Sequence, residues 1–289
     1  MTKVRIGTRG SQLALWQANE TSRRLRDAGY EPDLHIIKTT GDKRHDVSLA
    51  TIGGKGLFIK ELEEALERGD IDLAVHSLKD VPSIVPEHFV LAGFLERADP
   101  RDAWVHVDGR AIADMPAGSV IGTSAPRRRA QLAMLFPELR VEDIRGNVDT
   151  RINKARDGQY AGIILASAGL TRLGRAGEIT SYFSVDQMVP AAGQGIVAIE
   201  CLASNELAQA AARAINHEPS ERAALAERGV LQKFGTRLDC YSAVAVHASD
   251  STLRAFFSNG TRSIRAEGAT VGAVYESLVA QGAEELFER

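Results

Sequence analysis

Arginine side chains recur in this sequence at places where an apolar, strand-like stretch is expected to end. They are Arg9, Arg127, Arg128, Arg145, Arg151 and Arg172, and the hydroxyls of Ser11, Thr123 and Ser124 lie beside them in the chain. A guanidinium forms paired hydrogen bonds with a carboxylate or phosphate, and ligands of open α/β sheets bind at the carboxyl ends of strands. Any single arginine could simply be solvated on a helix surface. Their recurrence predicts a small ligand with several negative charges.

Three other side chains are of types that carry proton-transfer or thiol chemistry. Asp80 follows the strand-like residues 71–76, where it could face a ligand or serve as a turn residue before Pro82. Position alone favours the turn. Cys240 precedes a strand-like stretch and could be a reactive thiol, whereas Cys201 ends an apolar run and is expected to be a small buried hydrophobe.

Several familiar site types are excluded by spacing. Residues 53–56 lack the first glycine and the hydroxyl of a phosphate-binding loop, because Leu49 and Gly56 occupy those places. Lys55 could still direct a positive charge into a cleft. Residues 193–198 match a dinucleotide fingerprint in letters, but they precede a strand instead of following one. The seven histidines and two cysteines show no metal-ligand spacing, so we expect no metal site.

Hydrophobic periodicity predicts alternating strands and helices over most of the chain. Expected strands cover residues 4–8, 34–37, 71–76, 120–123, 161–166 and 196–200, and later 243–247, 253–257 and 264–267. Expected helices cover residues 11–29, 58–69, 126–135, 147–158, 205–214, 220–231 and 271–287, with Ser11 and Asn147 as N-caps and Pro126 in a first turn. This order predicts two similar α/β domains with mostly parallel sheets, then a small α+β domain of β-β-β-α order.

Composition narrows the class of protein. The chain has 289 residues, a formal net charge of −3, 44% hydrophobic and 25% charged residues, all ordinary for globular proteins. The slightly acidic balance argues against general nucleic-acid binding. No apolar run is long enough to cross a membrane, and the first residues lack an export signal, so we expect a cytoplasmic protein with reduced thiols.

Taken together, the motifs resemble the porphobilinogen deaminase family. The matching segments occur in family order at residues 8–18 (TRGSQLALWQA), 53–58 (GGKGLF), 74–82 (AVHSLKDVP), 122–128, 145–148, 168–174 and 190–195. The resemblance implies a transferase of tetrapyrrole (haem) biosynthesis, which joins four porphobilinogen molecules head to tail with release of ammonia. The product would be linear hydroxymethylbilane. It also implies a dipyrromethane cofactor joined to Cys240 by a thioether, and Asp80 as the catalytic carboxylate that stabilises positive charge on the pyrroles.

The resemblance also implies the remaining site residues. Those that bind the cofactor would be Cys240, Lys79, Asp80, Thr123, Ser124, Arg127, Arg128, Arg145 and Gly146. Those that bind substrate would be Arg9, Ser11, Lys55, Arg145, Arg151, Arg172 and Gln194. No metal is implied.

The implied fold is α/β, with two doubly wound domains like type II periplasmic-binding-protein lobes and a small α+β third domain. Domain 1 would cover residues 1–97 and 193–215, domain 2 residues 98–192, and domain 3 residues 216–289 with the cofactor cysteine. The active cleft would lie between the first two. We expect a monomer that binds neither nucleic acid nor membrane and passes its product to uroporphyrinogen-III synthase.

The sequence departs from the family pattern around Cys240, where Leu238 and Asp239 replace the usual glycines and Tyr241 and Ser242 follow. Pro126 and Arg129 also differ from the commonest pattern. An alternative of another class is a two-lobed anion-binding protein without catalysis, since such folds often serve as ligand clamps. Incubation with porphobilinogen distinguishes the two, because only an enzyme consumes it.

Overall fold

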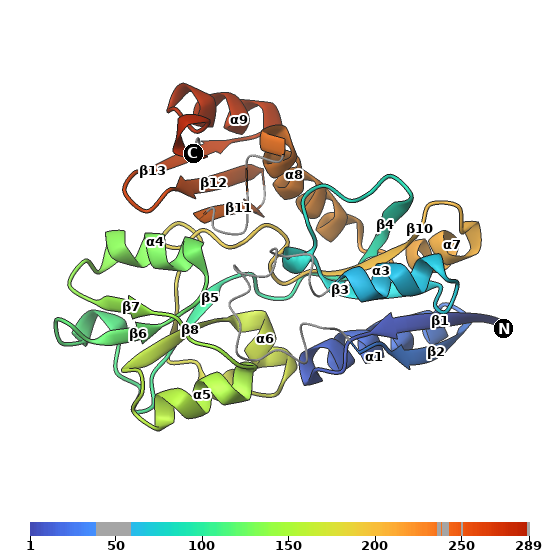
Figure 1. Ribbon diagram of the computed structural model, residues 1–289, viewed down its shortest axis with the longest axis horizontal. Helices are drawn as coiled ribbons and strands as arrows, with labels where there is room; N and C mark the ends of the chain where they lie inside the picture. The colour runs from blue at the N-terminus through green and yellow to red at the C-terminus, as the bar shows by residue number, and fades with distance from the viewer. Residues whose placement is uncertain (39–58, 236–237, 239–242, 250, 288–289) are drawn as a thin grey trace. The chain divides into compact units, whose positions relative to one another are not determined.

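The computed structural model describes residues 1–38, 59–235, 238, 243–249 and 251–287 (Figure 1). The chain divides into two compact units. The first contains Met1–Ala98 and Gly195–Leu225, and the second contains Asp99–Gln194 and Ala226–Arg289. The chain therefore passes between the units at residues 98–99, at residues 194–195 and within helix α8 (Glu218–Phe234).

The first unit is built on a five-stranded sheet of order β2-β1-β3-β10-β4. Its strands are β1 (Thr2–Thr8), β2 (Tyr30–Ile36), β3 (Leu73–Ser77), β4 (Phe89–Phe94) and β10 (Val197–Leu202). Its helices are α1 (Gln12–Asp27), α3 (Lys60–Glu67), α7 (Glu206–Ala214) and the 3-10 helix η2 (Leu78–Asp80). Strands β1, β2 and β3 are parallel, and β10 is antiparallel to both of its neighbours.

Helices cover both faces of this sheet, as its strand sequences require. Leu73 and Val75 of β3 belong to one core with residues of α1 and α7, whereas Ala74 between them belongs to the core under α3. Successive strand side chains point to opposite faces, so a strand covered on both sides is apolar throughout. The continuous apolar run at residues 73–75 is explained in this way.

The second unit repeats the same strand arrangement, with order β7-β6-β8-β5-β9. Its strands are β5 (Asp102–Val105), β6 (Val120–Gly122), β7 (Arg140–Glu142), β8 (Gly162–Ala166) and β9 (Ser181–Tyr182). Its helices are α4 (Pro126–Leu135), α5 (Val148–Arg156), α6 (Ser167–Arg172), η3 (Ile112–Asp114) and η4 (Ala176–Glu178). In each sheet the fourth strand is antiparallel and follows directly on a passage between units. The prediction of two similar α/β domains is confirmed.

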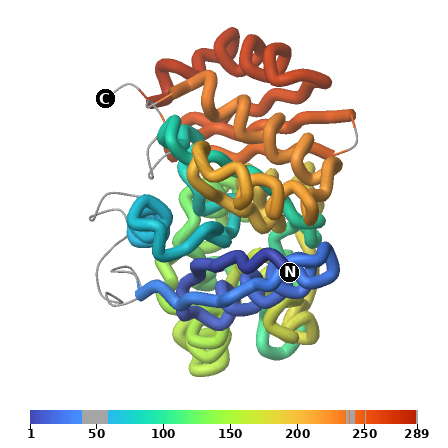
Figure 2. Tube along the Cα trace, turned by 90° about the vertical axis from the view of Figure 1, so that its right-hand side faces the viewer, coloured from blue at the N-terminus to red at the C-terminus, as the bar shows by residue number. Residues whose placement is uncertain are grey.

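A third, antiparallel sheet belongs to the second unit and has the predicted β-β-β-α order. It consists of β11 (Ala243–Ser249), β12 (Thr252–Ser258) and β13 (Ser263–Gly268), followed by α9 (Val271–Ala280) and the short η6 (Glu285–Phe287). Figure 2 shows the red helix α9 lying along these strands. Val274 and Leu278 of α9 share a core with Phe257 of β12 and Val230 of α8. The domain boundaries given above stay predictions.

The predicted helix caps and the predicted first-turn proline, which depend only on residues nearby in sequence, are confirmed. Ser11 and Asn147 cap α1 and α5, and Pro126 begins α4. Among the strands of the described residues, β4, β5, β7 and β9 were not predicted. Strands β7 and β9 are too short to show a period, and β5 begins with a charged residue that is nevertheless fully buried. The last helix ends at Ala280 instead of continuing to 287, and Gly282 adopts a positive φ just beyond it.

Candidate functional site

In the first unit, two pairs of predicted site residues follow neighbouring parallel strands. Arg9 and Ser11 follow β1, and Lys79 and Asp80 follow β3. These strands pair in parallel with Ile6 opposite Leu73, so their carboxyl ends lie at the same edge of the sheet. This is the edge at which open α/β sheets bind ligands.

Hydrogen bonds fix the elements that carry these residues. The Ser11 Oγ accepts from the Ala14 backbone N at 3.3 Å and caps α1. Farther along α1, the buried Gln17 donates from Nε2 to Ser77 Oγ at 2.7 Å, which joins α1 to the end of β3. Asp80 lies three residues after Ser77, half-buried in η2, whose Leu78 is fully buried. Asp80 is therefore presented from an anchored turn.

A buried contact between a histidine and a carboxylate lies just before this turn. His76 Nε2 and Glu200 Oε2 are 3.0 Å apart, and both side chains are almost fully enclosed. The pair joins β3 to β10, in addition to the backbone pairing of these strands. Burial and the nearby Glu200 charge raise the pKa of Glu63. The pair was not predicted from the sequence, although a glutamate inside the apolar run 196–201 signals that a partner is needed.

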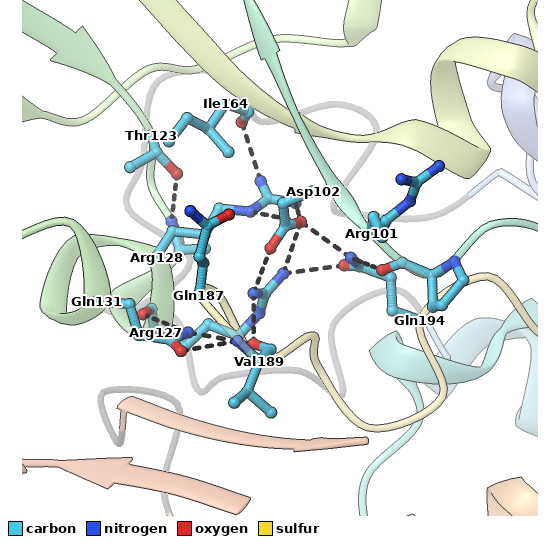
Figure 3. Close-up of polar contacts among 12 residues, drawn as sticks. Arg101, Asp102, Thr123, Arg127, Arg128, Gln131, Ile164, Gln187, Val189 and Gln194 are labelled. Atoms are coloured by element: carbon cyan, nitrogen blue, oxygen red, sulfur yellow. Dashed lines mark hydrogen bonds and ion pairs between the residues drawn. The ribbon is translucent and has the colours of Figure 1, made fainter. Parts of the chain in front are cut away.

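In the second unit, Asp102 gathers two of the predicted arginines around one fully buried carboxylate (Figure 3). The Arg127 Nη1 donates to Asp102 Oδ2 at 2.6 Å, and the Arg128 Nη2 donates to Asp102 Oδ1 at 2.7 Å. Both arginines are themselves buried, at 5% and 6% exposure. Their positive charges hold the pKa of the Asp102 carboxyl well below its usual range, while burial lowers the pKa of Arg128.

Gln194 completes this network. Its Nε2 donates to Asp102 Oδ1 at 2.9 Å and to Pro100 O at 2.7 Å, and its Oε1 accepts from Arg127 Nη2 at 3.0 Å. Gln194 is fully buried. The network thus links the two segments at which the chain enters and leaves this unit. One carboxylate and two guanidiniums leave a net charge of +1, so the network can still attract an anion.

Arg145, Gly146 and Arg151 lie at the start of α5. Gly146 has φ +112°, and a Cβ there would lie 2.5 Å from the Thr150 side chain, so only glycine fits. The Arg151 Nε donates to the Gly146 carbonyl at 2.8 Å. Burial, together with repulsion from Arg128 and Arg145, lowers the pKa of Arg151 to about 10. Three cationic side chains are therefore close enough to repel one another.

The other predicted residues of this unit lie after β6 and β8. Thr123 is fully buried. The Ser124 Oγ donates to the Ile144 carbonyl at 2.5 Å and accepts from its N at 3.1 Å, which ties the start of α4 to the segment carrying Arg145. Arg172 ends α6, and burial lowers its pKa to about 10. The loops after β6, β7 and β8 thus supply cations and hydroxyls from one unit.

Two predicted site residues, Lys55 and Cys240, lie outside the described residues, as do residues 39–58, Asp239, Tyr241 and Ser242. Cys201 is fully buried, and burial raises its pKa to about 11, which confirms its interpretation as a buried hydrophobe. Within the described ranges, His, Cys, Asp and Glu form no group able to hold a metal ion. No helix of the described part is both long and apolar enough to span a membrane.

The donor set of the second unit suits a ligand with several carboxylates. Arg151 and Arg172 keep their charge at neutral pH despite burial, because a pKa of about 10 is still well above 7. A partly desolvated guanidinium gains more from a carboxylate than a fully hydrated one does. A dipyrromethane group, whose two pyrrole rings each carry an acetate and a propionate, meets this requirement.

Comparison with known proteins agrees with this chemistry. Residues 4–210 match the family model described as porphobilinogen deaminase, dipyromethane cofactor binding domain. Relatives named porphobilinogen deaminase include that of Geobacter sulfurreducens, 44% identical over 99% of this chain and 94% of its own length. Another, from Ralstonia nicotianae, is 44% identical over 98% and 86%.

Among solved structures, the methionine-binding protein MetQ aligns with a TM-score of 0.47 and 12% identity, covering 76% of this chain and 92% of that one. Lipoprotein Tp32 from Treponema pallidum aligns with a TM-score of 0.46 and 15% identity, covering 74% and 90%.

Proposed function

The chain belongs to the porphobilinogen deaminase family, and from this membership we propose that it joins four porphobilinogen molecules into hydroxymethylbilane on a covalently bound dipyrromethane primer. The observation that carries the proposal is the cationic set in the second unit. Arg127 and Arg128 surround Asp102 with a net charge of +1, and Arg145 and Arg151 lie close by. A growing chain adds two carboxylates with each pyrrole, so the ligand becomes more anionic at every step.

The residues proposed to hold the cofactor are Lys79, Asp80, Thr123, Ser124, Arg127, Arg128, Arg145 and Gly146, with Cys240 as the point of attachment. When bound, the dipyrromethane group supplies a terminal pyrrole with a free α-carbon. The support from the structure is that Ser124 and Gly146 hold the loops after β6 and β7 in place. The arginines on these loops are thereby pre-organised for carboxylates, which reduces the cost of ordering them on binding.

The residues proposed to contact porphobilinogen are Arg9, Ser11, Lys55, Arg145, Arg151 and Arg172, and Gln194 is proposed to support them indirectly. Arg151 and Arg172 suit this role because a bound carboxylate compensates for the desolvation of their buried positive charge. Gln194 already donates to Asp102 and Pro100, so we propose that it acts on substrate by fixing Arg127.

Asp80 is proposed to do the acid–base work. In each cycle the C–N bond of the substrate's aminomethyl group breaks, its electron pair stays on the nitrogen, and the nitrogen accepts one proton to leave as ammonia. A C–C bond then forms from the methylene carbon to the α-carbon of the preceding pyrrole, which loses a proton. Positive charge develops on pyrrole nitrogens in both steps. A fixed carboxylate that accepts from pyrrole N–H groups stabilises this charge, and it can carry the proton between the two steps.

We propose further that the protein is a monomer in the cytoplasm, that it is divided at the domain boundaries expected from the sequence, and that uroporphyrinogen-III synthase receives its product. Family membership supports these points. Size-exclusion chromatography with light scattering measures the oligomeric state, and a dimer mass would overturn that part of the proposal.

The experiment that tests the function follows consumption of porphobilinogen and release of ammonia by the purified protein. One mole of ammonia should appear for each mole of porphobilinogen consumed, and one mole of tetrapyrrole should form for every four moles of porphobilinogen. Asp80→Asn should keep its covalent cofactor but lose at least ~10²-fold in kcat, since one acid–base or charge-stabilising group contributes about 10² to 10⁴. Asp70→Asn, an exposed change in the same unit, is the matched control.

A wild-type protein that binds porphobilinogen without consuming it would favour the anion-binding alternative and overturn the proposed function. Near-normal turnover of Asp80→Asn would remove only Asp80 from the mechanism.

A further inference from the structure

Helix α8 carries a fully buried carboxylate, Glu227, that the chemistry above does not use. Its Oε2 accepts from the backbone N of Gly193 at 2.6 Å, and its Oε1 accepts from the backbone N of Ala248 at 2.8 Å. His247 Nδ1, also buried, lies 3.4 Å from Oε1. Burying a carboxylate costs free energy unless hydrogen bonds compensate for its lost hydration. The two backbone N–H groups provide this compensation, and they fix the position of the Glu227 carboxylate.

The three elements joined by Glu227 are far apart in sequence. Gly193 lies in the segment that leads out of the second unit, adopts φ +73°, and is followed directly by Gln194 of the Asp102 network. Ala248 lies in β11. Ala192, beside Gly193, packs against the core shared by α8 and the third sheet. Glu227 therefore connects the third sheet to the segment that contacts Arg127.

Only a carboxylate of this length satisfies both contacts. Each of its oxygens faces a backbone N–H donor. A glutamine offers one accepting oxygen and one donating NH₂ group, so one backbone N–H would face another donor. An aspartate lacks one methylene and cannot reach as far.

In the sequence, Cys240 lies between the end of α8 at Phe234 and the start of β11 at Ala243. Building on the proposed function, we propose that Glu227 is a positioning residue. It holds α8 and β11, the elements on either side of the cofactor cysteine, to the Gly193–Gln194 segment that touches the arginine network. The tethered pyrrole chain is thereby kept in register with its carboxylate-binding arginines as it lengthens.

The test uses the holoenzyme of Glu227→Gln, with Glu218→Gln as control, an exposed glutamate on the same helix. Each protein receives one to four equivalents of porphobilinogen, and intact mass is used to quantify covalent species with one, two or three added pyrroles. Steady-state kcat and KM and amide hydrogen exchange at Gly193 and Ala248 are also measured.

We expect Glu227→Gln to keep its cofactor and to exchange at least one of these amides more than tenfold faster. We expect its kcat to fall about tenfold with KM nearly unchanged, and the longer covalent species to accumulate relative to wild type. A purely structural role would lower stability without changing the distribution of covalent species.

A distribution and kcat equal to those of wild type would overturn the inference while leaving the proposed function intact. A wild-type chain that forms no covalent species would overturn the proposed function, and the inference with it. If Glu227→Gln does not fold, Glu227→Asp is measured in the same way and judged by the same two criteria.

Discussion

Replacing Asp102 by asparagine removes one negative charge from the centre of the arginine network at almost constant volume. Asp102 is fully buried and accepts hydrogen bonds from Arg127, Arg128 and Gln194. The asparagine leaves two buried guanidiniums without a counter-ion, and its NH₂ group faces a donor. Breaking a buried ion pair by removing one partner costs about 3 to 5 kcal/mol of stability. We expect the free energy of unfolding of the second unit to fall by that amount.

Thermal and denaturant unfolding of both proteins measure this loss. A chain of this size loses roughly 2 to 4 °C of melting temperature per kcal/mol, so we expect a decrease of about 6 to 20 °C. Asp99→Asn is the matched control, because Asp99 pairs with Arg101 at 2.7 Å while both side chains are partly exposed. An exposed pair of this kind contributes about 1 kcal/mol or less.

The pH dependence follows from the direction of the pKa shift. The Asp102 pKa is lower in the folded protein than the value of 3.8 expected when unfolded. Its contribution to stability is therefore complete above that pH and is lost as the pH falls below it. The stability difference between wild type and Asp102→Asn should be constant near neutral pH and shrink in acid. A difference below 1 kcal/mol at pH 7 would refute the electrostatic account of this network.

Two further predictions concern single residues. Arg151→Gln should raise the KM for porphobilinogen about tenfold in initial-rate assays, because a lost charge-assisted hydrogen bond worth about 1.4 kcal/mol weakens binding tenfold. The exposed control Arg156→Gln should leave KM unchanged. An unchanged KM in Arg151→Gln would remove Arg151 from the substrate site. Cys201, with its pKa raised to about 11, should not react with a thiol reagent at pH 8 in the native protein. In denaturant one thiol per chain should react, because the Cys240 sulfur is committed to the thioether, and two reactive thiols would contradict the attachment.

Features set by local chemistry could be predicted from the sequence. Ser11 and Asn147 cap helices through bonds to nitrogens three residues away, so the chain itself shows them. Hydrophobic periodicity predicts the alternation of strands and helices, and from this order two α/β domains and a third domain with a small sheet could be predicted. The short strands β7 and β9 could not be predicted, because two or three residues show no period and pair only once the sheet exists.

The arrangement of the site was less accessible. The position of the arginines after strands predicts that they bind anions, but it could not show that Arg127 and Arg128 form hydrogen bonds with a buried carboxylate. Asp102 lies 25 positions before Arg127 and 92 before Gln194, and only the folded sheet brings them together. Glu227 was missed for the same reason, since its partner Gly193 lies 34 positions earlier.

The intact mass of the purified, untreated protein tests the central claim most directly. We expect a mass above that of the sequence by two porphobilinogen units less their ammonia, and we expect Cys240→Ser to show no such excess. A wild-type mass equal to that of the bare sequence, in a protein that still converts porphobilinogen, would contradict the claim that this chain builds its product on a covalently held dipyrromethane.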